Sequence, residues 1–157
     1  MNDLLKSRVV SHQFFQSMNP EHLEIVTGCA SEVAFKPDQV LFLESEPASQ
    51  FYLIESGRIA LETHDPAKGT ALVQNLGAGD VLGWSWLFPP FAWHFQARAV
   101  EPSKAIALNA GHLLAAAERD RDFGYELMKR VAQVVIQRLQ AARRRFLNEA
   151  GCRSSTA

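Results

Sequence analysis

Between Cys29 and Leu108 the sequence alternates short apolar segments with turn-forming residues, and this alternation limits the possible folds more than any other feature. The apolar segments are rich in β-branched and aromatic residues, as in QVLFL, FYLIESG, RIALE and TALVQNL. The turns between them include Lys36-Pro37-Asp38, Ser56-Gly57 and Gly77-Ala78-Gly79-Asp80. Many short strands with turns between them and no long helix are typical of an antiparallel sandwich or barrel. We therefore expect residues 29–109 to form a β-barrel.

Helical signals precede the expected barrel. Residues 1–28 are interpreted as an N-terminal helical segment in which Asn19 caps a short helix, Pro20 occupies its first turn and Gly28 ends it. A chain of 157 residues has the size of one domain, so this segment, the barrel and the residues after the barrel are assigned to a single domain.

Helical signals also occur after the barrel, where residues 110–149 are expected to form a short helix and then a long one. Asp120 or Asp122 caps the long helix, which is predicted to end near Asn148. Residues 150–157 are expected to be a disordered tail.

The long helix carries an apolar stripe that must be covered. Its members recur every 3.6 residues on average, and Leu127 with Val134 widens the apolar surface onto a second side. The stripe consists of Met128, Val131, Val135, Leu139, Ala142 and Phe146. One side of such a helix covers the barrel and the other covers a twin helix, so we expect a homodimer through this helix.

Composition excludes several classes of partner. A net charge of -1, with 47% hydrophobic and 21% charged residues, gives no overall attraction to nucleic acid or to an anionic membrane. No apolar run approaches the ~20 residues of a membrane span, and the N-terminus has no signal-peptide pattern, so a cytoplasmic protein is expected. Cys29 and Cys152 are far apart and are expected to stay reduced.

No catalytic or metal-binding motif is visible. Histidines occur singly, without an HxH or HExxH arrangement, and no nucleophile elbow, Walker loop or dinucleotide-binding glycine pattern is present. The histidines are His12, His22, His64, His94 and His112. We therefore expect a protein without a metal, without a cofactor and without enzymatic activity.

The segment from Gly79 to Val100, GDVLGWSWLFPPFAWHFQARAV, gathers all three tryptophans of the chain. Its glycines, its Gly79-Asp80 pair and the strand after the loop resemble the phosphate-binding cassette of cyclic-nucleotide-binding domains. The segments HQFFQSMNPEHLEIV and FKPDQVLFLESEPASQFYLIESGRIALE extend the resemblance over about residues 12–148. The chain is thus similar to the cyclic-nucleotide-binding domain of the catabolite activator and fumarate-nitrate regulator families.

This resemblance implies a fold and a function. The fold is mainly β with flanking helices, a double-stranded β-helix (a jelly-roll, cupin-like barrel) plus a long C-terminal helix. The function is that of a non-enzymatic regulatory module that senses a small-molecule effector and passes its signal to another protein, which the sequence does not identify. Cupin oxygenases share the barrel shape, but the paired histidines and glutamate that such enzymes carry on neighbouring strands are absent here.

Two departures from the family change what the resemblance implies. In the family a glutamate follows the cassette glycine and an arginine follows the loop, whereas here Trp84 follows Gly83, and Trp93 or His94 lies near the arginine position. An anionic phosphate without such a cation faces a cost of several kcal/mol, so cyclic nucleotide is not expected to bind in the usual way. Only a short segment follows the long helix, so no DNA-reading domain and no direct contact with nucleic acid are expected.

The candidate ligand-binding residues are carried over by cassette position. Gly83 allows close approach of a ligand, the indoles supply stacking area, Ser85 and His94 offer hydrogen bonds, and Arg98 is a candidate partner for an anion. The set is Gly83, Trp84, Ser85, Trp86, Leu87, Trp93, His94, Phe95 and Arg98.

Four interpretations of this cluster stay open. The rings line a pocket for an apolar or aromatic effector, or they fill the pocket themselves and leave a structural or protein-interaction module. In a third interpretation they form an exposed patch for a partner protein. In the fourth, cyclic AMP still binds through non-standard contacts such as Arg98.

Overall fold

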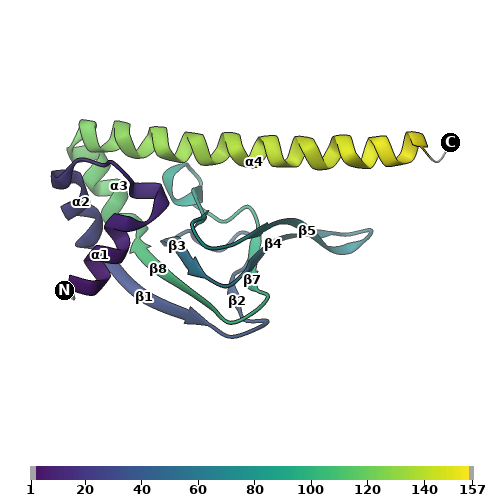
Figure 1. Cartoon of the computed structure of the whole chain (residues 1–157), viewed down its shortest axis with the longest axis horizontal. Coiled ribbons are helices and arrows are strands. Elements are labelled where there is room, and N and C mark those ends of the chain that lie inside the picture. The colour runs from purple at the N-terminus through teal and green to yellow at the C-terminus, as the bar shows by residue number, and fades with distance from the viewer. Residues whose placement is uncertain (1–2, 156–157) are drawn as a thin grey trace.

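The computed structural model describes the backbone of residues 3–155 and the side chains of residues 3–150, and its main body is a pair of antiparallel β-sheets (Figure 1). One sheet has the strand order β1-β8-β3-β6 and the other β2-β7-β4-β5. The first comprises β1 Ala30–Phe35, β8 Ser103–Asn109, β3 Gln50–Ser56 and β6 Val81–Leu82. The second comprises β2 Val40–Phe42, β7 Gln96–Ala99, β4 Ile59–Asp65 and β5 Gly69–Leu76. The predicted mainly β, jelly-roll architecture is confirmed.

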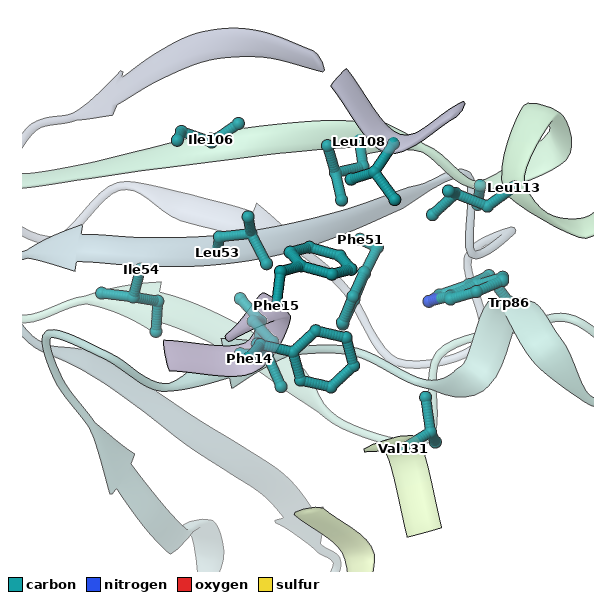
Figure 2. Close-up of a cluster of buried hydrophobic side chains, with 14 of the residues drawn as sticks. Phe14, Phe15, Phe51, Leu53, Ile54, Trp86, Ile106, Leu108, Leu113 and Val131 are labelled. Atoms are coloured by element: carbon teal, nitrogen blue, oxygen red, sulfur yellow. The ribbon is translucent and has the colours of Figure 1, made fainter. Parts of the chain in front are cut away.

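Alternation along the strands decides which side chains enter the core. In β7, Ala97 and Ala99 are fully buried while Gln96 and Arg98 lie on the outer face. The central strands β3 and β8 supply larger apolar side chains, and these meet the aromatic rings of Phe14 and Phe15 (Figure 2). These two rings come from the short 3-10 helix η1, Gln13–Phe15, which therefore covers part of the core.

Three further helices gather at one end of the sheets, as Figure 1 shows: α1 Asp3–Ser11, α2 Pro20–Thr27 and α3 Ala110–Arg119. The start of α2 has the predicted chemistry, because the Asn19 side chain accepts a hydrogen bond from the Glu21 backbone N–H at 2.8 Å and Pro20 occupies the first turn. Gly28 is its C-cap, also as predicted.

The long helix α4 runs from Arg121 to Ser155, and it lies along one side of the barrel (Figure 1). Asp120, rather than Asp122, caps it, since the Asp120 carboxylate accepts from the Phe123 N–H at 3.2 Å. The helix continues past Asn148, where its end was predicted, and it includes residues 150–155 of the expected disordered tail. A single glycine in this stretch costs only about 1 kcal/mol and no proline is present to stop the helix. Residues 156 and 157 of that tail lie outside the described residues.

Two different faces of α4 carry apolar side chains. Phe123, Leu127 and Val131 are buried against the body of the protein, whereas Leu139 and Phe146 are 68% and 70% exposed. Of the stripe predicted from sequence, Val131 thus lies on the barrel side, and the exposed members lie on another side of the helix. None of the described helices combines the length and the hydropathy that a membrane span requires.

Candidate functional site

The cassette begins directly after β6 at Gly83, a position that accepts only a residue without a side chain. Gly83 has a φ of +91°, and an added Cβ would lie 2.2 Å from a ring atom of Trp93. The chain then forms a short 3-10 helix, η2 Ser85–Leu87, and a loop that returns to β7. This path turns Trp93 back onto Gly83.

Trp93 fills the space beside Gly83. Its indole stacks on Phe42 with ring centroids 3.7 Å apart and an interplanar angle of 11°, and the side chain is only 5% exposed. Two backbone hydrogen bonds hold the loop in place. The Trp93 N–H donates to the Glu46 carbonyl, and the Ser45 N–H donates to the Trp93 carbonyl. The loop therefore holds a packed indole directly beside Gly83.

Trp86 belongs to the core of the protein. It is 1% exposed, its Nε1 donates to the Gly83 carbonyl at 2.8 Å, and its ring lies 5.5 Å from that of Phe51. Figure 2 shows Trp86 at the edge of the buried cluster, near Phe51 and Leu113. Its role is to anchor η2, so it does not line the cassette cavity.

Trp84 is half-buried and is covered by a cation from α4. The Arg138 guanidinium lies 4.7 Å from the centroid of the Trp84 ring and donates a hydrogen bond to the Val81 carbonyl. Burial lowers the pKa of Arg138 to about 10, against which nearby Asp80 acts weakly. Among the described residues, Arg138 forms no ion pair with a carboxylate.

Ser85 and His94 form a pair across the loop. The Ser85 Oγ and His94 Nδ1 lie 3.0 Å apart, and Ser85 is 4% exposed whereas His94 is exposed. The buried hydroxyl is thus used to hold the two ends of the loop together.

The cavity that remains at the cassette is about 10 Å³ in volume, close to the smallest space that holds one water molecule. Five of the predicted site residues line it, namely Gly83, Trp84, Ser85, Trp93 and Phe95. Leu87 and His94 are not among its lining residues. The rings therefore occupy this space in the structure.

Arg98 points away from this cavity. It donates to the Glu62 carboxylate at 3.1 and 3.2 Å and to Asp38 at 2.9 Å on the outer face of the second sheet. The ion pair lowers the pKa of Glu62 and raises that of Arg98. The suggestion that Arg98 holds an anion in the cassette is corrected by this geometry, because the alternation of β7 directs Ala97 and Ala99 inward instead.

Sequence reasoning missed Phe42, Leu61, Leu82 and Arg138, which complete the wall of the cavity. The sequence did contain a pattern that places Arg138 near the barrel. Arg138 follows Leu127, Val131 and Val134 at helical spacing, so it lies on the side of α4 that packs on the barrel. No group of three or more histidine, cysteine or acidic residues within the described part of the chain is arranged to hold a metal.

Comparisons with known proteins place this geometry in a family. A family model described as "Cyclic nucleotide-binding domain" matches residues 32–120. The crystal structure of a Geobacter metallireducens protein, provisionally described as a cyclic nucleotide-binding protein, is 27% identical with a TM-score of 0.79 and covers 88% of this chain and 99% of that one.

Two curated relatives match shorter segments. The cAMP/cGMP-dependent 3',5'-cAMP/cGMP phosphodiesterase B of Dictyostelium discoideum is 26% identical over 48% of this chain and 7% of its own length. The CRP-like cAMP-activated global transcriptional regulator of Mycobacterium tuberculosis is 24% identical over 60% of this chain and 42% of its own length. The chain therefore spans less than half the length of either relative.

The matched residues run from β1 to the end of α3 and include the whole segment from Gly79 to Val100. This chain belongs to the cyclic nucleotide-binding domain family.

Proposed function

We propose that this protein is a non-enzymatic regulatory module of the cyclic nucleotide-binding fold whose cassette is closed by its own aromatic side chains. The observation that carries the proposal is the packing of Trp93 between Gly83 and Phe42, which leaves a cavity of about 10 Å³. A nucleotide requires a cavity of several hundred Å³. Binding one would therefore require the Trp93 ring to leave its stacked position.

The charges around the cassette support the same proposal. The family's acid and arginine are replaced, and the cation nearest the cavity, Arg138, lies over the Trp84 ring and bonds to a backbone carbonyl. Transferring a phosphate into such a site without a bidentate cation costs several kcal/mol. We infer that cyclic nucleotide is not the ordinary effector at this position.

Ser85 and His94 have the spacing of a nucleophile and its base, yet their setting favours a structural role. The Ser85 hydroxyl is buried beneath the loop, so a substrate carbonyl cannot approach it. The similarity to a phosphodiesterase covers 7% of that protein and carries no activity to this chain. These points support a module without catalysis.

The exposed face of α4 supports a homodimer. Its apolar side chains recur at alternating spacings of three and four residues, the pattern of a coiled-coil seam. They are Tyr125, Met128, Ala132, Val135, Leu139, Ala142 and Phe146, all of them exposed in the single chain. At 100° per residue this seam lies on the side of the helix away from Leu127 and Val134, so a twin helix can pack there while the barrel stays in place. We propose that a separate protein reads the state of this dimer.

Calorimetric titration with cyclic AMP and cyclic GMP tests the closed cassette. We expect no binding to the wild-type protein at concentrations up to about 1 mM, a limit that corresponds to roughly -4 kcal/mol. Phe88→Ala, which removes a 42% exposed ring from the same loop, serves as the matched control for Trp93→Ala. Micromolar affinity of the wild-type protein that Trp93→Ala abolishes and Phe88→Ala retains contradicts the proposal.

A second candidate function is the sensing of an aromatic effector by an opened cassette. It is favoured by Trp84, which is half-buried and covered by the guanidinium of Arg138 rather than by the core. A thermal-shift panel of aromatic acids distinguishes the two: a rise in melting temperature that Trp84→Ala removes supports this candidate over the closed cassette.

A further inference from the structure

A second cavity lies between α4 and the barrel, and Arg138 lines both this cavity and the closed cassette. Its volume is about 320 Å³, which lies in the range of sites that hold small metabolites. The barrel contributes Gln74 of β5 together with Asp80 and Val81, and α4 contributes polar side chains from successive turns. We call this space the α4 cleft.

The α4 cleft carries more positive than negative charge. Arg130, Arg138 and Arg144 line it, against one carboxylate, Asp80. Arg130 is neutralised by Glu126 at 2.8 Å, and Asp80 accepts a hydrogen bond from the Gly77 N–H at 2.8 Å. In the part of the chain that the structure describes, neither Arg138 nor Arg144 forms an ion pair.

Arg138 is the most informative of these residues because its charge is buried. Its partners are the Val81 carbonyl and the face of Trp84, neither of which is an anion. Burial of a guanidinium that forms no ion pair is unfavourable and lowers the pKa of Arg138, although Asp80 in the same cleft opposes this effect. An anion in the α4 cleft would supply the missing charge.

Three amide side chains accompany these cations. Gln133 and Gln137 line the cleft from exposed positions on α4, and Gln74 lines it from a half-buried position on β5. A primary amide both donates and accepts hydrogen bonds, which suits the hydroxyl groups of a polyol. Arginines beside several amides therefore favour a ligand that carries both an anionic group and hydroxyl groups.

We propose that the α4 cleft binds a small phosphate monoester that carries hydroxyl groups, of the sugar phosphate class. Arg138 and Arg144 hold the phosphate, and Gln74, Gln133 and Gln137 hold the hydroxyls. The proposal is independent of whether the cassette is closed, because the two cavities have different walls apart from Arg138.

The position of the cleft on α4 is compatible with a dimer. Gln133, Gln137 and Arg144 lie on one side of the helix, and at 100° per residue the seam of Leu139 and Phe146 lies roughly opposite. A twin helix packed on the seam leaves the cleft open. A phosphate that draws Arg138 away from Trp84 would also change the cover of the cassette, so the site connects the ligand to both elements.

Calorimetry with ribose 5-phosphate, inorganic phosphate and uncharged ribose tests the proposal on the full chain at low ionic strength. We expect ribose 5-phosphate to bind, inorganic phosphate to bind more weakly, and ribose not to bind. Arg144→Gln and Arg138→Gln each weaken the binding of both phosphates by about tenfold or more, the effect of losing one charge-assisted contact. Gln137→Leu weakens ribose 5-phosphate but leaves inorganic phosphate unchanged.

Arg143→Gln is the matched control, since Arg143 is exposed on the same helix and does not line the cleft. Arg144 is exposed as well, so Arg144→Gln keeps the test valid even where Arg138→Gln fails to fold, a point that circular dichroism decides. Binding that Arg143→Gln weakens as much as Arg144→Gln overturns the proposal, and so does the absence of ribose 5-phosphate binding at millimolar concentration. Binding of cyclic AMP that Trp93→Ala changes and Arg144→Gln leaves unchanged bears on the cassette, because Trp93 lines only the cassette cavity and Arg144 only the α4 cleft.

Discussion

The indole of Trp93 lies so close to the α-carbon of Gly83 that a Cβ on this glycine would come within 2.2 and 2.4 Å of two ring atoms. Gly83 also has a left-handed backbone conformation, with φ of +91°. Closure of the cassette therefore depends on two properties of one residue, its backbone freedom and its lack of a side chain.

Gly83→Ala is expected to lower the free energy of unfolding by about 2 to 5 kcal/mol, because it adds a left-handed backbone penalty to a steric clash. Gly69→Ala is the matched control, since Gly69 has φ of +78° but nothing lies within 4 Å of its added Cβ. The control is expected to cost only the backbone part, about 1 to 2 kcal/mol. Equal losses in a denaturant titration of the two variants would show that Trp93 does not restrict Gly83.

Trp93→Ala is expected to cost about 3 to 5 kcal/mol of unfolding free energy, because it leaves a cavity between Gly83 and Phe42. Three rings and two leucines line this space, so added indole should raise the melting temperature of this variant and leave that of the wild-type protein unchanged. Phe88→Ala, at a 42% exposed ring, provides the comparison and should lose far less stability. A loss as small as that of the control would indicate that Trp93 is not a core residue.

The fold was predictable because its signals are local. Short alternating strands, the Asn19 and Asp120 caps and the helical period after Asn109 each act within a few residues. The aromatic segment was likewise recognisable as a cassette from the residues in it. In both cases neighbouring residues in sequence carry the whole signal.

The orientation of site residues was less predictable because distant segments determine it. The sequence shows that Arg98 shares a face with Gln96, but only the packing of Ala97 and Ala99 in the core, opposite Leu61 and Ile59 of β4, decides that this face is the outer one. Arg138 enters the site from α4, far along the chain from the cassette. Neither relationship is encoded in a local pattern.

Leu139→Glu is expected to separate the proposed dimer into single chains. Leu139 is 68% exposed in the single chain and lies in the middle of the seam, where a buried carboxylate would weaken association by about 100-fold or more. Gln140→Glu adds the same charge beside the seam and should leave the mass measured by analytical ultracentrifugation unchanged. Two variants with the same mass would show that the seam is not a dimer interface.

The stability of the protein should fall as the pH drops through the range just below 6.5, because of His12. This side chain is buried, its Nδ1 accepts from the Phe14 N–H at 3.2 Å, and its Nε2 therefore donates to the Ile54 carbonyl at 3.2 Å. Burial lowers the pKa of His12 below its ordinary value of 6.5, although the Ile54 carbonyl, Glu55 and Asp80 oppose this effect. The folded state thus keeps His12 neutral at a pH at which the unfolded chain already binds a proton.

This difference in proton uptake sets the sign of the effect. Well above pH 6.5, His12 is neutral in both the folded and the unfolded state, and the full stability is present. Below pH 6.5, the unfolded state binds up to one proton more than the folded state, so the free energy of unfolding falls by up to about 1.4 kcal/mol per pH unit. The Arg8 ion pair lowers the pKa of Glu55, so its own effect starts only near and below its ordinary value of 4.5, and measurements between pH 5 and 7 isolate His12. In that range His12→Gln should flatten the dependence of unfolding free energy on pH, and His64→Gln, at an exposed histidine, should leave it as in the wild type. Identical slopes for the wild-type protein and His12→Gln would assign the acid sensitivity to other groups.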